Sequence, residues 1–316
     1  MKRKLLVVGS VNTDLVVRTS QLPSPGHTVM GRDFHTYGGG KGANQAVAAA
    51  RAGAEVTFAG CVGDDAFGAE RRAELINEGI DVSALGTVNN VATGVGLIVI
   101  DDAAENQIAV APGANALMTS AMLEGLDFSQ FGVVLVQLEI PLETVEAALR
   151  KGRGAGCMTI LNPAPATTAA HGFLSQVDIL LPNEHEVAIL AAALAATAAP
   201  EGEAVQAQAE QLMAQGAGKI VVTQGRRGAL IAETGEEGTA HFFDMAAVAV
   251  EAVDTVGAGD CFAGWVAAKM AAGCTLKDAV NFARHAAALS VTRRGAMASM
   301  PTHIEVAAMM ERVGAA

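Results

Sequence analysis

Short apolar runs alternate with longer segments of helical spacing through most of the chain. The runs are continuous and rich in Val, Ile and Leu, and they cover residues 5–8, 56–60, 133–138, 158–161, 179–181 and 220–223. Such runs are typical of strands buried on both faces of a parallel sheet. Helical composition and spacing occur over 42–52, 67–78, 142–153, 186–196, 204–215, 261–272, 276–292 and 302–312. This alternation predicts an α/β fold with a mostly parallel central sheet and helices on both faces.

Two regions, residues 12–37 and 93–111, lack helical periodicity. The second contains strand-like runs at 95–100 and 107–110 around a polar turn, which indicates a hairpin. Strand pairs outside the main sheet predict a small β lid over a pocket. The alternative is that they are only additional strands at the edge of the sheet. Apolar residues exposed on such a lid would favour burial against a second subunit, and the candidates are Leu15, Val17, Ile98 and Val110. We therefore expect one α/β domain over 1–316 with this discontinuous lid, paired as a homodimer.

Composition and charge restrict the possible partners. The 316 residues are 51% hydrophobic and 17% charged, which allows a substantial core and argues against disorder. The net charge of −12 argues against nucleic acid or an anionic membrane as a partner. The apolar run at 5–9 is too short for a signal-peptide core, and the alanine-rich stretch 187–199 is too short to span a bilayer, so we expect a soluble cytoplasmic protein. Four cysteines without a C-x-x-C spacing indicate small buried residues in a reducing compartment: Cys61, Cys157, Cys261 and Cys274.

The stretch from Asp254 to Asp260 contains the strongest chemical signal. Three small residues, Gly257 to Gly259, separate its two carboxylates and lead into an expected helix. Small residues let backbone N–H groups surround an anion, and a helix N-terminus adds unpaired donors and a partial positive charge. A carboxylate there repels phosphate, but it has a use if it contacts the group that attacks phosphate. The pattern predicts an anion hole with Asp260 as general base, although a Gly-rich turn with an N-capping Asp fits equally well.

Two further clusters follow expected strands near the N-terminus. Residues 38–46 are rich in glycine and precede an alanine-rich helix with Asn44 in its first turn. The P-loop spacing is absent, and alone this stretch favours a tight turn. Asn12 and Asp14 follow the first strand at a spacing of two, so both side chains share one face of an extended chain. An amide beside a carboxylate at the carboxyl end of a strand suits a polyhydroxyl ligand, and an Asx turn is the alternative.

Polar residues also follow three later strands. Glu139 comes directly after the run at 133–138. Asn183 and Glu186 stand at the start of a helix, where hard oxygen ligands suit Mg²⁺ held through water. A capping arrangement of the same pair is compatible with that role. Residues 223–228 follow another strand, where either a nucleotide or a simple β-turn could lie.

Together these residues resemble the ribokinase-like family of sugar kinases, over nearly the whole chain. Residues 39–46 look like the family's N-terminal signature and 254–260 like its C-terminal one, with Asn183-x-x-Glu186 between them. The combination is highly specific, whereas each motif alone is weak. The resemblance implies a three-layer α/β/α domain with a β lid through which subunits pair. It also implies ATP-dependent phosphoryl transfer to the 5-hydroxyl of D-ribose.

The resemblance also implies roles for individual residues. Asp260 matches the catalytic base, and the anion hole matches Gly257, Ala258 and Gly259. Ribose contacts fall on Asn12, Asp14, Gly40, Lys41, Asn44 and Glu139. Nucleotide contacts fall on Asn183, Thr223, Gly225, Gly228, Gly259 and Arg284, with Mg²⁺ held through water by Glu186. The monovalent cation site, usually for K⁺, matches Asp254, Val256, Ser290, Arg293, Gly295 and Ser299.

Two departures and several alternatives remain. Val256 replaces a frequent Thr or Ile, but only its carbonyl is needed. Arg284 stands where relatives often carry His or Asn near the adenine, and a cation there could alter nucleotide preference. Another sugar, such as 2-deoxyribose or a fructose-like one, or a nucleoside could be the acceptor. The Asn12 and Asp14 pair favours the vicinal hydroxyls of ribose, and 4% aromatic residues argue against a stacked base. A non-catalytic sensor would be expected to lose the base or the glycines, and both are present.

Overall fold

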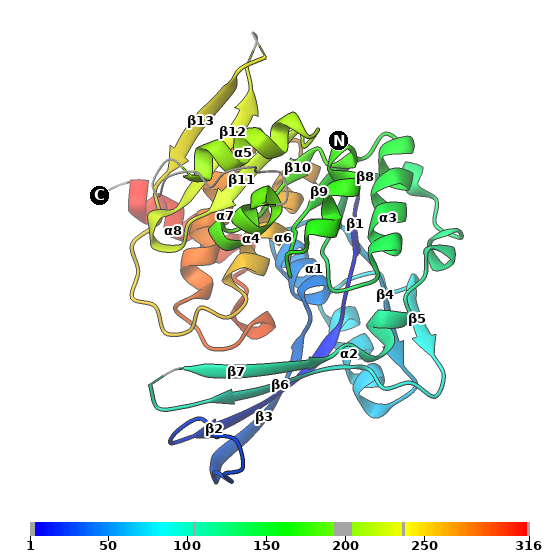
Figure 1. Cartoon of the computed structure of the whole chain (residues 1–316), viewed down its shortest axis with the longest axis vertical. Helices are drawn as coiled ribbons and strands as arrows, with labels where there is room; N and C mark the ends of the chain where they lie inside the picture. Colours follow the sequence, from blue (N-terminus) through cyan, green and yellow to red (C-terminus); the bar gives the residue numbers. More distant parts are fainter. Residues whose placement is uncertain (1–3, 104, 193–203, 236–237, 315–316) are drawn as a thin grey trace.

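A nine-stranded sheet forms the centre of the computed structural model, which describes residues 4–103, 105–192, 204–235 and 238–314 (Figure 1). The strand order is β13-β12-β11-β10-β9-β8-β1-β4-β5. Seven strands run parallel: β1 (Lys4–Val8), β4 (Val56–Gly63), β5 (Leu85–Val88), β8 (Phe131–Val136), β9 (Met158–Leu161), β10 (Ile179–Leu180) and β11 (Lys219–Thr223). At one edge β12 (Ala229–Thr234) and β13 (Ala240–Met245) pair in antiparallel orientation. The prediction of a mostly parallel sheet is confirmed.

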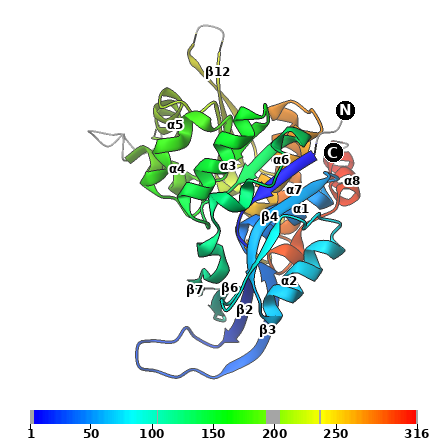
Figure 2. The ribbon, with the colours of Figure 1, turned by 90° about the vertical axis from the view of Figure 1, so that its right-hand side faces the viewer.

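Each face of the sheet is covered by helices, because alternate residues of the continuous apolar strands point to opposite sides. Leu5 and Val7 belong to one core and Leu6 and Val8 to the other. The first core packs α1 (Lys41–Arg51), α2 (Ala66–Asn77), α6 (Ala258–Ala271), α7 (Leu276–Ser290) and α8 (His303–Gly314). The second packs α3 (Leu142–Gly154), α4 (Glu184–Ala192) and α5 (Ala204–Ala214), on the other flank in Figure 2. The predicted three-layer α/β/α arrangement is confirmed.

Short 3₁₀ segments occur in the connections between these elements. They are η1 (Gly113–Leu117), η2 (Ser120–Leu123), η3 (Phe128–Gln130), η4 (Thr168–Gln176), η5 (Gly225–Arg227) and η6 (Met297–Ser299). Two of them matter for the candidate site: η1 lies next to the first lid strand, and η6 lies in the loop between α7 and α8.

A second, four-stranded sheet projects from one end of this body (Figure 1). It contains β2 (Asn12–Thr19), β3 (Gly31–Gly39), β6 (Gly94–Ile100) and β7 (Asn106–Ala111) in the order β3-β2-β6-β7. The hairpin expected at 93–111 is the antiparallel pair β6–β7, while β2 pairs in parallel with β6. Because β2 follows β1 directly and β3 runs into α1, the lid strands join the body beside the candidate site.

The apolar surface of the lid differs from the expected set. Val110 is more than half exposed, but Leu15, Val17 and Ile98 are partly buried. The other large apolar side chains exposed on the sheet are Phe34, Leu97 and Ile108. The pairing register places Phe34 and Leu97 on one face and Ile108 and Val110 on the other, which is also the face of Asp14. Both faces of the lid therefore carry exposed apolar groups.

Several element boundaries differ from the prediction. Helix α6 begins at Ala258, three residues early, because the glycine-rich stretch itself forms the first turn. The β12–β13 hairpin was not predicted, since its strands mix polar residues with apolar ones. The end of the helix expected at 186–196 lies outside the described residues.

Cys274 is partly exposed, so the prediction of buried cysteines is wrong for it. Within the described ranges, no helix is both long and apolar enough to cross a bilayer.

Candidate active site

The start of α1 is fixed at the carboxyl end of β1 by one carboxylate. Oε2 of Glu139, which follows β8, accepts hydrogen bonds from Ser10 Oγ at 2.6 Å and from the backbone N–H of Lys41 at 3.0 Å. The close approach also requires Gly42, because a β-carbon there would lie 2.6 Å from the backbone nitrogen of Ser10. Glu139 therefore joins the loops after β1 and β8 and orients the first turn of α1.

Asn12 and Asp14 lie on the same face of β2, as predicted, and glycines of the neighbouring strands make room for them. A β-carbon on Gly94 would lie 2.2 Å from Asn12 Oδ1. On Gly39 and Gly96 it would lie 2.2 Å and 2.6 Å from the Asp14 carboxylate oxygens. Asn12 Oδ1 also accepts a 2.7 Å hydrogen bond from Asn115 Nδ2, so the amide offers its NH₂ group as a donor to a ligand.

The Asp14 carboxylate, partly buried on strand β2, has an unusual electrostatic environment. Burial raises the pKa of Asp14 to about 6; the charges of Glu139 and Asp260 act in the same direction, and Arg71 opposes them. The three carboxylates are therefore close enough to interact, although they come from β2, the end of β8 and α6. An amide donor beside a carboxylate acceptor can bind adjacent hydroxyl groups of one small polyol.

Asp260 stands in the first turn of α6 and is buried, with 8% of its surface exposed. Asn44 Nδ2 donates to its Oδ2 at 2.9 Å, and Gln45 Nε2 donates to its Oδ1 at 2.8 Å. Both donors belong to α1, which approaches α6 closely because Gly264 has no side chain: a β-carbon there would lie 2.4 Å from the Gln45 carbonyl oxygen. The carboxylate is thus held by two side chains of α1, beside the N–H groups at the start of α6.

A cavity of about 210 Å³ adjoins Asp260. Its lining unites residues from five separate segments: Lys41, Asn162, Ala164, Leu181, Asn183, Glu186, Thr223, Gly257, Gly259, Asp260, Phe262 and Ala263. Burial by itself would lower the pKa of Lys41, but the charges of Asp260, Glu139 and Glu186 outweigh it and raise the pKa. A permanent ammonium and a helix N-terminus in one cavity form a site for an anion such as phosphate.

Asn183 and Glu186 form the reciprocal capping pair that the sequence allowed. The backbone N–H of Asn183 donates to Glu186 Oε2, and that of Glu186 donates to Asn183 Oδ1, both at 2.8 Å. Burial raises the pKa of Glu186, while the bond from Asn183 opposes the rise. Among the described residues, no group of three His, Cys, Asp or Glu side chains could hold a metal. A lone carboxylate fits Mg²⁺ that is bound chiefly by substrate phosphates and water.

A family model described as pfkB family carbohydrate kinase matches residues 2–303. The chain belongs to this family. The pfkB kinases that it resembles include ribokinase of Schizosaccharomyces pombe, 40% identical over 96% of both chains. Deoxyribokinase of Salmonella typhi is 34% identical over 94% of this chain and 95% of the relative. A structure of Arabidopsis thaliana ribokinase complexed with ribose and ATP has a TM-score of 0.87 and 30% identity, and covers 98% of this chain and 99% of that one.

Only some of the residues expected to contact the nucleotide line the cavity of this pfkB kinase. Thr223 is joined to Asn183 by a β-bridge and lines the cavity. Gly225 and Gly228 belong to the turn before β12 and do not line the described cavity. Gly228 has a structural reason to be glycine, because a β-carbon would lie 2.0 Å from the Met245 carbonyl oxygen. Arg284 donates to the Ala246 carbonyl oxygen at 2.8 Å, so it holds the loop that follows β13.

The expected cation residues of the kinase form two adjacent segments, 254–256 and 290–299. Asp254 joins them, since its carboxylate accepts from the backbone N–H of Val256 at 3.0 Å and of Gly295 at 2.9 Å. Ser299 Oγ instead donates to the Ala296 carbonyl oxygen at 2.8 Å, and Ser290 Oγ to that of Ala287 at 2.9 Å. A donor set of carboxylate, hydroxyl and carbonyl oxygens fits a hard monovalent cation.

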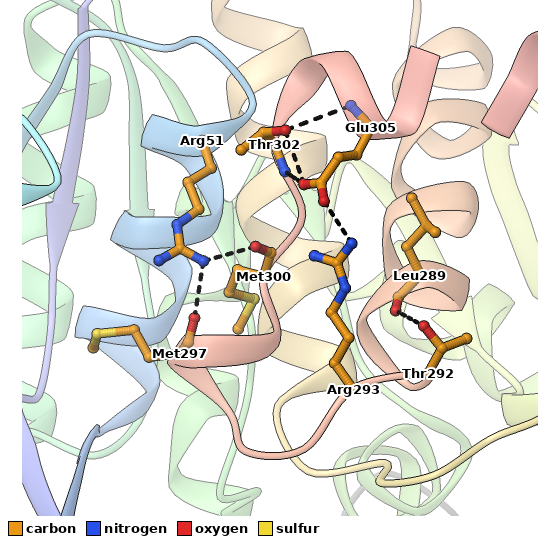
Figure 3. A network of polar contacts seen from close by, with 8 residues as sticks. All are labelled: Arg51, Leu289, Thr292, Arg293, Met297, Met300, Thr302 and Glu305. Carbon is orange, nitrogen blue, oxygen red and sulfur yellow. Dashed lines mark hydrogen bonds and ion pairs between the residues drawn. The ribbon is translucent and has the colours of Figure 1, made fainter. Parts of the chain in front are cut away.

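Two arginines hold the second cation segment in place (Figure 3). Arg51, at the end of α1, donates to the carbonyl oxygens of Met297 at 3.3 Å and Met300 at 2.7 Å. Arg293 donates to Glu305 Oε1 of α8 at 2.6 Å. Helix α1 therefore contacts Asp260 with its first turn and the loop before α8 with its last residue.

Sequence reasoning missed several polar residues of the kinase site. They are Ser10, Gln45, Asn115, Gln137 and Asn162, and all are buried. Asn115 and Gln137 lie outside the recognised motifs, and Gln45 stands inside one without an assigned role. The signal that could have found Gln45 is a polar side chain in a helix that is otherwise alanine and valine over 46–50.

Proposed function

We propose that this pfkB kinase transfers the γ-phosphoryl group of ATP to the 5-hydroxyl of D-ribose. The observation that carries the proposal is the position of Asp260. It stands at a helix N-terminus, between the cavity suited to phosphate and the pair of Asn12 and Asp14. The name of the S. pombe relative and the ribose and ATP of the Arabidopsis structure support the choice of substrates.

The roles of the residues follow from phosphoryl-transfer chemistry, which needs positioning and charge neutralisation more than covalent catalysis. Asn12, Asp14, Asn44 and Glu139 with the Gly40–Lys41 turn would hold the sugar. Asp260 would accept the proton of its primary hydroxyl. The N–H groups of Gly257, Ala258 and Gly259 would stabilise the negative charge that develops on the transferred phosphoryl group. The Lys41 ammonium would add a positive charge on the same side.

The nucleotide and ion sites belong to the same proposal. Asn183 and Thr223, with Gly225, Gly228 and Arg284, would follow the nucleotide, and Glu186 would hold Mg²⁺ through water. Bound Mg²⁺ would neutralise phosphate charge, and K⁺ at the segments 254–256 and 290–299 would do so beside the anion hole. Its ligands would be Asp254 and Ser299 with the backbone carbonyls of Val256, Ser290, Arg293 and Gly295. KCl should therefore activate the enzyme more than choline chloride.

The variant Asp260→Asn tests the catalytic assignment. Without a proton acceptor, kcat should fall at least roughly 100-fold, while the Kd for ribose measured by calorimetry changes little. Glu124→Gln, on an exposed turn away from the site, is the matched control and should retain full activity. Near-normal turnover by Asp260→Asn would remove Asp260 from the role of base.

A sugar panel with ADP release as the readout distinguishes ribose from its rivals. The deoxyribokinase relative makes 2-deoxyribose the closest alternative. Asn12 offers a donor and Asp14 an acceptor, and the pair is best used by two adjacent hydroxyls, so ribose should have the higher kcat/KM. Equal values for ribose and 2-deoxyribose would contradict this preference. Turnover of fructose or a nucleoside alone would reassign the acceptor, and ATP binding without activity on any sugar would favour a sensor.

We further propose that the chain is one domain whose lid mediates a homodimer in the cytoplasm. Phe34, Leu97, Ile108 and Val110 leave large apolar groups exposed on both faces of the lid sheet, and burial against a second copy would cover them. Light scattering should give about twice the chain mass. Leu97→Glu and Ile108→Glu, one on each face, would identify the buried face by dissociating the dimer. A monomer at all concentrations would contradict the pairing.

A further inference from the structure

A chain of buried side-chain amides ends on the Asp260 carboxylate. Gln137, directly after β8, donates from Nε2 to Gln45 Oε1 at 2.6 Å. Gln45 donates from Nε2 to Asp260 Oδ1 at 2.8 Å and to Asn162 Oδ1 at 2.9 Å. Asn162, after β9, donates to the Leu181 carbonyl oxygen at 2.8 Å. Gln45 and Gln137 have no exposed surface. The chain thus joins α1 to the carboxyl ends of three adjacent strands.

The direction of each amide in this chain is determined by its neighbours. An ionised carboxylate only accepts hydrogen bonds, so the NH₂ group of Gln45 must face Asp260. In the reversed orientation of Gln45, its oxygen would face the carboxylate and its NH₂ group would face that of Gln137. Asn162 is oriented in the same way, because its NH₂ group faces a backbone carbonyl. Asp260 and Asn162 therefore fix the orientation of Gln45, and Gln137 supports it by donating to Gln45 Oε1.

We propose that Gln45, oriented by Asn162 and supported by Gln137, is a positioning residue for the catalytic base; this inference rests on the proposed role of Asp260. Asn44 binds Oδ2 and Gln45 binds Oδ1, so the two adjacent residues of α1 fix the plane of the carboxylate. The lone pairs that these two bonds leave free would accept the proton of the sugar hydroxyl. Since Gln45 is fully buried, it acts through Asp260 and does not touch substrate.

The variant Gln45→Glu tests whether Gln45 positions the Asp260 carboxylate or only fills space in the buried polar cluster. It preserves the shape of the side chain but places a second carboxyl group against Asp260. Two adjacent carboxyls share a proton, because like charges disfavour the doubly ionised form. The acid limb of the pH profile of kcat should therefore move to higher pH by about one unit or more. The Kd for ribose should change less than about threefold, because the direct contacts with the sugar remain.

The exposed residue Gln206 of α5 provides the matched control. Gln206→Glu makes the same chemical change away from the site and should leave the pH profile unmoved. If folded Gln45→Glu, judged by its Tm, has the wild-type acid limb while Asp260→Asn is inactive, Gln45 has no positioning role. If Asp260→Asn itself keeps its turnover, the base assignment fails, and the inference falls with it.

Gln137→Met provides a second test that does not depend on folding of Gln45→Glu. It removes the donor to Gln45 Oε1 and leaves Asp260, Asn44 and the sugar contacts unchanged. Loss of one net hydrogen bond from the chain should lower kcat by roughly 2–10-fold without raising the Kd for ribose. An unchanged kcat in the folded variant would overturn the proposed support of Gln45 by Gln137.

Discussion

Asp14 and Gly96 face each other across β2 and β6, and a β-carbon built on Gly96 would lie 2.6 Å from Asp14 Oδ1. Real β-carbons do not approach other atoms this closely, so the carboxylate lies in space that a side chain at position 96 would fill. Gly39 on the other neighbouring strand has the same relation to Oδ2, at 2.2 Å. The lid strands thus hold a buried carboxylate between two glycines.

Gly96→Ala should therefore displace the Asp14 carboxylate and weaken sugar binding. We expect the KM for ribose to rise on the order of tenfold, the equivalent of about 1.4 kcal/mol, with a smaller change in kcat. Gly86→Ala in β5 is the control, because its nearest new contact would be an ordinary 3.7 Å to Cys61 Sγ. Steady-state kinetics of both variants check the prediction. A wild-type KM in Gly96→Ala would show that Asp14 does not hold the sugar from this position.

The pH dependence of sugar binding should follow Asp14. Its pKa of about 6 is raised from 3.8, so the free enzyme carries the neutral acid below about pH 6. The neutral acid has lost acceptor capacity for hydroxyl groups. The kcat/KM for ribose, which reports the free enzyme, should therefore fall about tenfold per pH unit below this pKa. In Asp14→Asn the value should be low throughout and this limb should be absent. An identical limb in Asp14→Asn would assign it to another group.

Most strands, most helices and the two signature motifs were predictable because their causes are local. Continuous apolar runs such as those of β1 and β8 arise because these strands are buried on both faces. Glycine-rich stretches before helices arise where the backbone passes close to other atoms. Gly94 and Gly96 have the same spacing as Asn12 and Asp14, but only the strand register shows that these glycines pair with them.

The amides around Asp260 were not predictable for a physical reason. Gln45 and Asp260 are 215 residues apart in the chain, and their contact depends on the packing of α1 against α6. Gln137 at the end of β8 has no local pattern, since a polar residue after a strand is ordinary. The same holds for Arg51, which looks like a solvent-exposed helix end and instead binds the carbonyls of a distant loop.

Arg51→Ala should weaken both the fold and the cation segment. It removes hydrogen bonds to Met297 and Met300 and the ion pair with Glu78, whose side chains are about three-quarters buried. We expect a loss of about 1–3 kcal/mol of unfolding free energy and a higher K⁺ concentration for half-maximal activity. Arg150→Ala, which breaks an exposed pair with Glu146, should cost less than about 0.5 kcal/mol. Urea titration and KCl titration measure the two effects. An unchanged KCl curve would separate Arg51 from the cation segment.

Gly257 and Gly259 both line the cavity, but alanine should act on them in opposite ways. Gly257 has φ of 77°, and a β-carbon there would lie 2.9 Å from the Ala296 α-carbon, so Gly257→Ala strains the backbone and pushes on the cation segment. We expect its Tm to fall by at least about 2–4 °C. Gly259→Ala meets nothing within 4 Å, and alanine favours a helix over glycine by about 1 kcal/mol, so its Tm should hold or rise.

Activity should nevertheless fall in Gly259→Ala, because the added methyl group occupies the cavity where phosphate would approach the helix N–H groups. We expect kcat to fall on the order of tenfold or more, the loss typical of a disturbed anion-stabilising donor. Thermal unfolding and steady-state kinetics on the same samples separate the two glycines. A stable Gly259→Ala variant with full turnover would mean that the transferred phosphoryl group does not pass this helix start, and the anion-hole assignment of Gly257, Ala258 and Gly259 would then be wrong.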